Sequence, residues 1–351
     1  MIHYIVCNNP PLGTLPVASG PGMRARQLYW QVKAAGHEAR FVMFADRYSM
    51  TCGVDNLPHG HREMQLVPNG LFGDFVERIE PGVFIFTQAN FPSELSKAAR
   101  HHHIVFDFIA RKDLEFIASG KEAAALKYLD DVRTYMDHAH TVLVTSPKLA
   151  AHVEAEYGRK PLLNPFAFQP EDHVKFVKPT ITFGGRIHKW TNYAITFDGL
   201  ADYFETHPEH RGLFMFDSAI EGVEDPHAKS VNRLLTLPNV TRVGMLPTRQ
   251  AAELVGRSHL FVDSSFQGEE RDFATSIRTV HALSLGTPVY HNAGTGLDDV
   301  YPDFPGRLGP EPDAAVVERT VDDALSGAFE APLKAVQASM KRMLSEKALA
   351  W

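Results

Sequence analysis

Short, nearly continuous apolar segments recur along the chain and alternate with stretches whose apolar residues repeat at helical spacing. In the first half, five such segments are expected to form strands: residues 2–7, 39–44, 83–87, 103–108 and 141–145. Apolar strands separated by helices are typical of a parallel sheet covered on both faces. The rhythm restarts in the second half, with expected strands at residues 180–183, 212–216, 240–243, 260–263 and 287–291. The pattern predicts an α/β protein with two doubly wound, Rossmann-like domains.

Between the two sets of strands, residues 160–179 contain several prolines and little periodicity, which is typical of a linker. We therefore expect a first domain at residues 1–169 and a second at residues 170–330. From residue 331 to residue 351, apolar residues stand at helical spacing. This tail is predicted to form a C-terminal helix that docks back on the fold.

The composition narrows the class of protein. The chain has 351 residues, 44% of them hydrophobic and 22% charged, which suits a globular protein with two domains. No apolar run approaches the roughly 20 residues of a membrane helix, and no basic leader precedes the first strand. We expect a cytoplasmic protein without a transmembrane segment. A net charge of -7 lowers the expectation of nucleic-acid binding without removing it.

Cysteine and histidine do not predict a metal site. The two cysteines, Cys7 and Cys52, are too few for a disulfide framework and lack metal-ligand spacing. The three histidines at residues 101–103 cannot converge on one ion from a strand, because adjacent side chains point to opposite faces. We expect no metal and no permanently bound cofactor.

Glycines stand at the start of an expected helix in the first half of the chain. Gly20 and Gly22 precede Arg24 there, where free N–H groups favour anions and glycine lets a ligand approach the backbone. Taken alone, a Gly-Pro-Gly sequence is more typical of a simple turn.

The second half places candidate phosphate-binding residues after its strands. Gly185, Arg186 and Lys189 follow the first of these strands, at the edge where open α/β sheets bind ligands. Thr275, Ser276 and Ile277 lie in the segment 273–278, where a helix that runs to Leu285 is expected to begin and where the helix N-terminus favours an anion. The same hydroxyls could instead cap that helix, and the sequence favours neither interpretation.

Together these segments resemble glycosyltransferase family 4. The likeness covers the glycine loop, the Gly-Gly-Arg sequence at residues 184–186, and the long block 240–289 with its Gly-Thr-Pro-Val ending. It implies the GT-B fold, in which two Rossmann-like domains face each other across a cleft. It further implies a nucleotide-sugar donor, bound mainly by the second domain.

The resemblance also implies roles for single residues. Gly20, Gly22 and Arg24 would face the donor, and Gly185 would lie beside it. Arg186 and Lys189 would neutralise the leaving diphosphate, although the lysine stands closer to the arginine than is usual in the family. The segment that borders the nucleotide base would be formed by Gly244, Met245 and Leu246.

Two positions depart from the family pattern. Family members commonly carry two glutamates eight positions apart, and alignment on the Gly-Thr-Pro-Val motif puts Phe273 and His281 there. His281 could still hydrogen-bond a ribose, whereas Phe273 cannot replace a sugar-binding carboxylate. Glu269, Glu270 or Asp272 could supply the acid, and Glu270 is preferred because some relatives keep a glutamate three positions before the phenylalanine. The departure leaves the sugar open.

Asp107 ends the strand at residues 103–108 and resembles a carboxylate on the acceptor side of the family's site. It would orient the acceptor hydroxyl or remove its proton, or else cap the following helix. The resemblance implies a retaining, metal-independent transfer of a hexose, with UDP-glucose the favoured donor, to a hydroxyl acceptor. The leaving phosphate itself would help to deprotonate the acceptor, so no protein nucleophile is expected.

Three alternatives stay open. A glycosyltransferase acting on a hydroxymethylated base in phage DNA shares the architecture and would need a basic cleft from Arg24, Arg26, Arg111 and Lys112. A sugar-nucleotide 2-epimerase would need a set of acidic residues that the sequence does not supply. A catalytically inactive nucleotide-sugar-binding protein would account for the loss of both glutamates.

Overall fold

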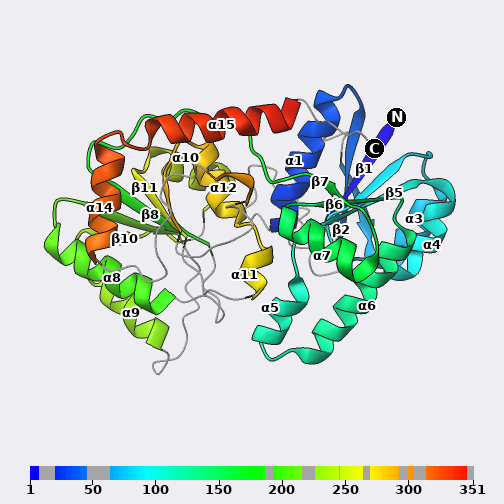
Figure 1. Cartoon of the computed structure of the whole chain (residues 1–351), viewed down its shortest axis with the longest axis horizontal. Helices are drawn as coiled ribbons and strands as arrows, with labels where there is room; N and C mark the ends of the chain where they lie inside the picture. The colour runs from blue at the N-terminus through cyan, green and yellow to red at the C-terminus, as the bar shows by residue number, and fades with distance from the viewer. Residues whose placement is uncertain are drawn as a thin grey trace. The chain divides into compact units, whose positions relative to one another are not determined.

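The structure is a computed structural model, which describes residues 1–7, 20–45, 64–185, 193–215, 226–244, 246–263, 269–291, 299–302 and 314–345. The chain divides into two compact units (Figure 1). The first unit comprises Met1–Phe166, Phe273–Thr275 and Arg342–Trp351, and the second Ala167–Asp272 and Ser276–Lys341. Each unit is built around one parallel sheet, so the predicted α/β class is confirmed.

The first unit contains a seven-stranded sheet in the order β3-β2-β1-β4-β5-β6-β7, with every neighbouring pair parallel. Its strands are β1 (Ile2–Cys7), β2 (Glu38–Ala45), β3 (Met64–Pro68), β4 (Val83–Phe86), β5 (His103–Phe108), β6 (Thr141–Val144) and β7 (Leu162–Leu163). The five strands predicted in this half are confirmed to within one residue at each end.

Helices cover both faces of the first sheet, and apolar side chains of successive strand residues alternate between these faces. Ile5 and Ile85 pack with α1 on one face, whereas Tyr4 and Phe84 pack on the other with α3, α4, α6 and α7. The helices are α1 (Gly20–Ala34), α3 (Phe72–Arg78), α4 (Leu95–His101), α5 (Lys112–Ala118), α6 (Glu122–His138) and α7 (Pro147–Tyr157), with short 3-10 turns η2 (Asn69–Leu71) and η3 (Pro92–Glu94). Burial on two sides explains why these strands are almost continuously apolar.

The second unit contains a five-stranded parallel sheet in the order β10-β9-β8-β11-β12. Its strands are β8 (Thr180–Gly184), β9 (Arg211–Met215), β10 (Val240–Arg242), β11 (Leu260–Asp263) and β12 (Val289–His291). All five were expected from the apolar pattern, and β12 begins two residues later than predicted. The backbone N–H of Thr287 donates to the carbonyl of Ala282, and Pro288 has no N–H, so neither residue can donate to a neighbouring strand.

Helices α8, α9 and α14 pack on the sheet of the second unit through one cluster of buried apolar residues. The helices of this unit are α8 (Tyr193–Thr206), α9 (Pro226–Leu235), α10 (Thr248–Arg257), α11 (Glu269–Phe273), α12 (Ile277–Ser284), α14 (Ala314–Leu325) and α15 (Glu330–Ser345). The last residue of α11 and the last four of α15 belong to the first unit. Helix α15 buries Leu333, Val336 and Met340, so the predicted C-terminal helix is confirmed as far as residue 345.

The segment predicted as a linker is more ordered than expected. Its first part forms the edge strand β7, where Leu162 pairs with Leu143 and Leu163 with Val144. Both leucines of β7 are exposed, and two residues are too few to give a strand pattern in the sequence. Further along, Lys175 donates to the carbonyl oxygens of Gly256, Ser258 and Gly286 at 2.7–2.9 Å. The segment is therefore structured, and the boundary between the two units, at Phe166 and Ala167, lies within it.

Candidate functional site

The second sheet has one position at which the direction of winding reverses. Its first strand, β8, lies between β9 and β11, so the chain moves outward to opposite sides from the β8–β11 pair. Ligands of such sheets bind in the crevice beyond the carboxyl ends of the strands at this position. Gly184 ends β8 and Asp263 ends β11, so both stand at the edge where a ligand is expected.

Asp263 and Arg278 connect the two strand ends. Arg278, in the first turn of α12, donates from Nη2 to Asp263 Oδ1 at 2.8 Å and from Nη1 to the carbonyl of Gly184 at 3.0 Å. The second carboxylate oxygen of Asp263 accepts from the Thr279 hydroxyl at 2.7 Å and from the Ser276 hydroxyl. One buried carboxylate therefore organises the start of α12 against β8 and β11.

Charge is retained on Asp263 despite its burial. Desolvation raises the pKa of this carboxyl, but the charges of Arg278 and His291 and the hydroxyl donors Ser276 and Thr279 lower it, leaving the pKa at about 2. Hydrogen bonds to the ionised form favour that form over the neutral acid. Asp263 is thus an ionised anchor for Arg278. This role of Asp263 could not be predicted from the sequence. An aspartate at the end of a strand is common, and its partner Arg278 stands 15 residues away.

Thr275 and Ser276, which were expected either to cap α12 or to bind an anion, differ in their contacts. Ser276 is the N-cap of the helix, and its hydroxyl accepts from the backbone N–H of Thr279. The Thr275 hydroxyl is buried and has no hydrogen-bond partner in the structure. Ile277 is the first helical residue, within the segment 273–278 where the helix was expected to begin. Capping therefore occupies Ser276 and leaves Thr275 as the candidate contact for an anion.

The other residues expected on the donor side lie on neighbouring elements. Gly244 follows β10 with a φ of +75°, a left-handed conformation that favours glycine. Leu246 is half-buried two residues further on. His281 lies on α12, with its ring edge-on to Phe168 at 5.3 Å. Arg186, Lys189 and Met245 fall outside the described residues.

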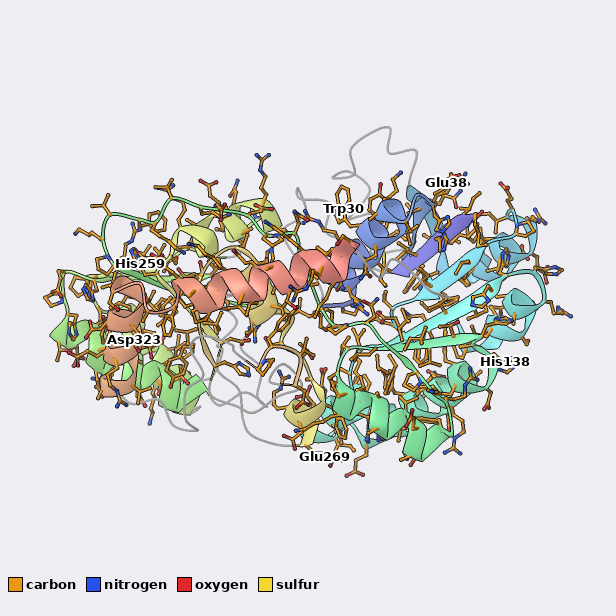
Figure 2. The ribbon with its side chains drawn as sticks, turned by 45° about the horizontal axis from the view of Figure 1, so that its top comes forward. Trp30, Glu38, His138, His259, Glu269 and Asp323 are labelled. Carbon is orange, nitrogen blue, oxygen red and sulfur yellow. The ribbon has the colours of Figure 1, made fainter. Side chains whose placement is uncertain are left out.

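Glu270, predicted as the replacement acid, lies on the short helix α11. Its carboxylate is mostly buried and accepts from the neighbouring Arg271, at 3.1 Å for the Nη2–Oε1 pair. Burial raises the pKa of Glu270, and Arg271 lowers it by a smaller amount. The adjacent Glu269 is exposed at the start of α11 (Figure 2). Only Glu270 of these two is held in one place by a charged partner.

Phe273 packs as an apolar side chain at the position where the resembled family carries a glutamate. It belongs to the first unit by its contacts and packs against that unit's core. Its ring lies 5.7 Å from the guanidinium of Arg111 and 5.2 Å from the ring of His152. Arg111 in turn makes a bidentate ion pair with the buried Asp113, at 2.6–3.1 Å. A carboxylate at residue 273 would have to compete for a cation that is already paired.

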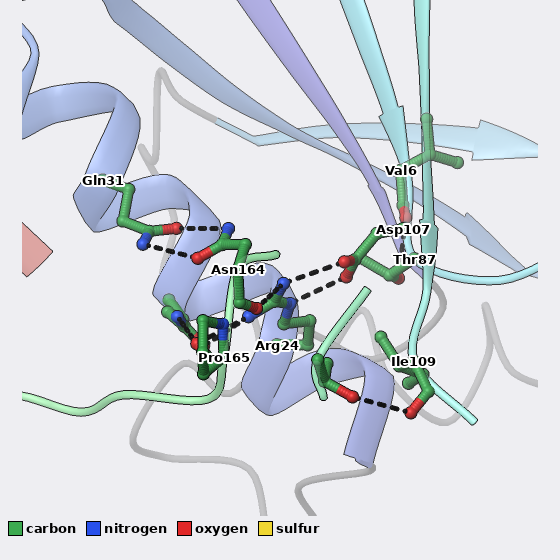
Figure 3. Close-up of polar contacts among 10 residues, drawn as sticks. Val6, Arg24, Gln31, Thr87, Asp107, Ile109, Asn164 and Pro165 are labelled. Carbon is green, nitrogen blue, oxygen red and sulfur yellow. Dashed lines mark hydrogen bonds and ion pairs between the residues drawn. The ribbon is translucent and has the colours of Figure 1, made fainter. Parts of the chain in front are cut away.

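The first unit pairs two residues that the sequence analysis treated separately. Arg24 Nε lies 2.8 Å from one oxygen of Asp107 and Arg24 Nη2 lies 2.9 Å from the other (Figure 3). The guanidinium also donates to Gln27 and to the carbonyls of Asn164 and Pro165. Both side chains have an exposed fraction of 0%. The ion pair is enclosed in the unit.

This enclosure corrects the expectation for Arg24. A side chain without exposed surface does not face a donor, and its fixed charge is compensated by Asp107 rather than by a phosphate. Gly22 is buried in the first turn of α1, and Gly20 begins that helix. Asp107 is the penultimate residue of β5, near the strand end as expected, but its two oxygens are directed to Arg24. The pair therefore positions the end of β5 and does not itself form a contact surface.

The structure also bears on a metal site, a membrane-spanning helix and a DNA-binding cleft. Among the residues that the structure describes, no three His, Cys, Asp or Glu side chains are grouped so that they could hold a metal ion. Within the same ranges, no helix is long and apolar enough to cross a membrane. The cations expected to line a DNA cleft include Arg24, which is enclosed, and Arg111, whose side chain is 14% exposed and ion-paired.

Known proteins resemble this chain in structure but not in sequence. No protein family and no curated protein matches the sequence. Solved structures match it over almost its full length. Sucrose-phosphate synthase from Thermosynechococcus elongatus superposes with a TM-score of 0.65 at 15% identity, covering 98% of this chain and 94% of the other. HepE from Anabaena, in complex with UDP and glucose, gives 0.65 at 14% identity, with 99% and 97% covered.

A third structure is the pneumococcal O-GlcNAc transferase GtfA in complex with UDP and GlcNAc, with a TM-score of 0.68 at 7% identity and coverage of 99% and 96%. The chain has the GT-B fold. In GT-B terms, the five-stranded sheet is the second Rossmann-like sheet, and the Asp263–Arg278 pair lies at its switch point. The fold implied by the sequence resemblance is therefore confirmed.

Proposed function

We propose that the protein is a glycosyltransferase that moves a hexose from a nucleotide sugar, with UDP-glucose the favoured donor, to a hydroxyl acceptor. The observation that carries the proposal is the switch point of the second sheet. There, Gly184 and Gly185 stand at the end of β8, and Arg278 at the start of α12 donates to the carbonyl of Gly184, which supports a diphosphate site at this edge of the sheet. Proteins of the same fold have been solved with UDP, one with glucose and another with GlcNAc.

The proposed reaction is retaining and needs no metal. The bond between the anomeric carbon and the diphosphate oxygen breaks, and its electron pair stays on the departing diphosphate. The acceptor oxygen bonds to the same face of the sugar, and its proton passes to the departing phosphate oxygen. Arg186 and Lys189 would hold the growing negative charge, which is electrostatic stabilisation of the transition state.

The remaining residues are proposed to bind the donor. Gly244, Met245 and Leu246 would border the base, and His281 would hydrogen-bond the ribose. Glu270 would contact the transferred sugar, because it stands three positions before Phe273, where some members of the resembled family keep a glutamate. Gly20 and Gly22 are retained as donor-side residues of the first domain. Asp107 and Arg24 are proposed to act on the acceptor side only by positioning the end of β5.

The domain limits are also part of the proposal. We place the acceptor-side domain at residues 1–169, the donor-binding domain at residues 170–330, and the docking helix at residues 331–351. Limited proteolysis tests these limits, since cleavage between domains should concentrate near residue 170 and release two folded fragments.

The proposed activity is tested by a thermal-shift screen of nucleoside diphosphates, followed by hydrolysis of the best-binding nucleotide sugar. A ligand at a hundredfold excess over its Kd stabilises the fold by about 2.7 kcal/mol, which a melting curve detects readily. Arg186→Ala should weaken binding and abolish slow donor hydrolysis, whereas Arg257→Ala, at a half-exposed arginine of α10, should not. Absence of stabilisation by every nucleotide would remove the proposal.

Two other functions give different outcomes in this screen. An inactive binding protein would be stabilised by UDP-glucose without releasing glucose. A DNA glycosyltransferase would transfer only in the presence of hydroxymethylated DNA, and the burial of Arg24 and Arg111 removes two of the four cations expected for it.

A further inference from the structure

Arg278 occupies a position that helix stability alone does not favour. It is the second residue of α12, and a cation in the first turn of a helix opposes the helix dipole. The guanidinium is nevertheless fixed at two points, to Asp263 and to the carbonyl of Gly184. Because the Arg278 charge does not stabilise α12 and is nevertheless fixed by two contacts, we looked for a role in ligand binding.

The surroundings direct Arg278 toward the crevice. Its side chain is 32% exposed, whereas its partner Asp263 is 2% exposed, so the pair presents its cation and hides its anion. Asp263 is also bound by Thr279 and Ser276, which fixes the carboxylate and spreads its charge over three donors. The strand ends that Arg278 bridges belong to β8 and β11, the pair at the switch point.

Gly185 provides space for this arrangement. It has a φ of +122°, and a Cβ at this residue would overlap the Arg278 guanidinium. The residue that follows β8 must therefore be glycine both for its backbone conformation and for the placement of Arg278. The glycine, the arginine and the aspartate act as one unit, formed from three separate segments of the chain.

From this geometry we infer that Arg278 is a phosphate-binding residue of the donor site, and that Asp263 is the positioning residue that aims it. The inference rests on the proposed function, and it adds a cation to those expected from the sequence. A guanidinium offers planar, paired N–H donors that match phosphate oxygens. It would act beside the N-terminus of α12, where the helix dipole favours an anion.

A purely structural role for Arg278 makes a different prediction. If it only ties β8 to β11, its loss should weaken the binding of every ligand of this unit equally. If it binds phosphate, its loss should affect UDP and spare uridine, which has the same base and ribose without phosphate. The ratio of the two affinities therefore separates the roles.

The experiment measures UDP, uridine and pyrophosphate binding by calorimetry, with the full chain and its Arg278→Gln and Arg278→Lys variants. Arg278→Gln should weaken UDP and pyrophosphate by about 10- to 100-fold and leave uridine within about twofold. Arg278→Lys keeps the charge but loses the planar guanidinium, so its UDP affinity should lie between those of the unchanged protein and Arg278→Gln. It also provides the test if Arg278→Gln does not fold. Arg233→Gln is the matched control, since Arg233 is 39% exposed and ion-paired on α9.

Each outcome decides the inference. Selective loss of UDP and pyrophosphate supports it. An equal loss of UDP and uridine, or no loss of either, overturns it while UDP binding by the unchanged protein still supports the proposed function. If the unchanged protein binds pyrophosphate through Arg278 but not UDP, the proposed function fails and the phosphate site stands. Failure to bind either probe overturns both.

Discussion

Arg24 and Asp107 form a fully enclosed bidentate ion pair, with both N–O distances between 2.8 and 2.9 Å. The two residues are 83 positions apart, and the pair joins the first turns of α1 to the end of β5. The same guanidinium holds the carbonyls of Asn164 and Pro165, so three segments of the first unit meet at one cation.

Replacing Asp107 with asparagine should destabilise the first unit strongly. The substitution leaves the Arg24 charge buried without a counter-charge, which typically costs about 3–5 kcal/mol. Urea unfolding measures the loss. Asp131→Asn is the control, because Asp131 pairs with the exposed Lys127 on α6 and such surface pairs contribute at most about 1 kcal/mol. Equal losses in the two variants would contradict a structural role for the pair.

Stability should depend on pH through Asp263. Its pKa in the folded protein is about 2, below the roughly 3.9 of an unfolded chain. A depressed pKa contributes stability that is fully present above about pH 5 and is lost as pH falls toward 2; the contribution here is about 2 kcal/mol. The difference in unfolding free energy between the unchanged protein and Asp263→Asn should therefore shrink over that range.

The comparison for Asp263 is Asp202→Asn, which removes an exposed carboxylate that is also paired with an arginine, Arg233. It gives the effect of losing an ion pair at the surface of the same unit. A difference for Asp263→Asn that stays constant from pH 5 to pH 2 would argue against an ionised anchor.

Gly185→Ala should cost stability and also reduce UDP binding. The positive φ alone costs about 1–2 kcal/mol for a residue with a Cβ, and the added methyl group must displace Arg278. Gly120→Ala pays only the first cost, because Gly120 has a φ of +69° and open space around the site of its Cβ. Unfolding curves should thus shift for both variants, whereas calorimetry should find weaker UDP binding only for Gly185→Ala. Unchanged UDP affinity in the Gly185 variant would separate Gly185 from the phosphate site.

Glu270→Gln should change the preference for the sugar and not for the nucleotide. A carboxylate that accepts from a sugar hydroxyl contributes about 1.5–3 kcal/mol, so UDP-glucose should bind about 10- to 100-fold more weakly. Binding of UDP itself should stay the same. Glu269→Gln changes the exposed neighbouring acid and should affect neither ligand. If UDP and UDP-glucose weaken together, Glu270 supports α11 and does not contact the sugar.

The strands were predictable because both faces of each sheet are buried, which leaves runs such as residues 83–86 wholly apolar. β7 escaped prediction because it is only two residues long and follows a proline. Within the candidate site, capping of α12 by Ser276 was one of the two interpretations that the sequence offered, because a single segment carries that signal. The Arg24–Asp107 and Asp263–Arg278 ion pairs join residues from separate segments of the chain. Such pairs can be recognised only when the folded sheets bring the segments together.

The packing of Phe273 limits how the missing family acid could be reinstated. A glutamate grafted at residue 273 would replace a ring in contact with Arg111 and His152, and would place a second carboxylate near a guanidinium already held by Asp113. Such a graft would exchange a hydrophobic anchor for an unmatched charge. Sugar choice should instead be altered at Glu270, three residues upstream on the same helix, where an acid already stands and Phe273 can remain.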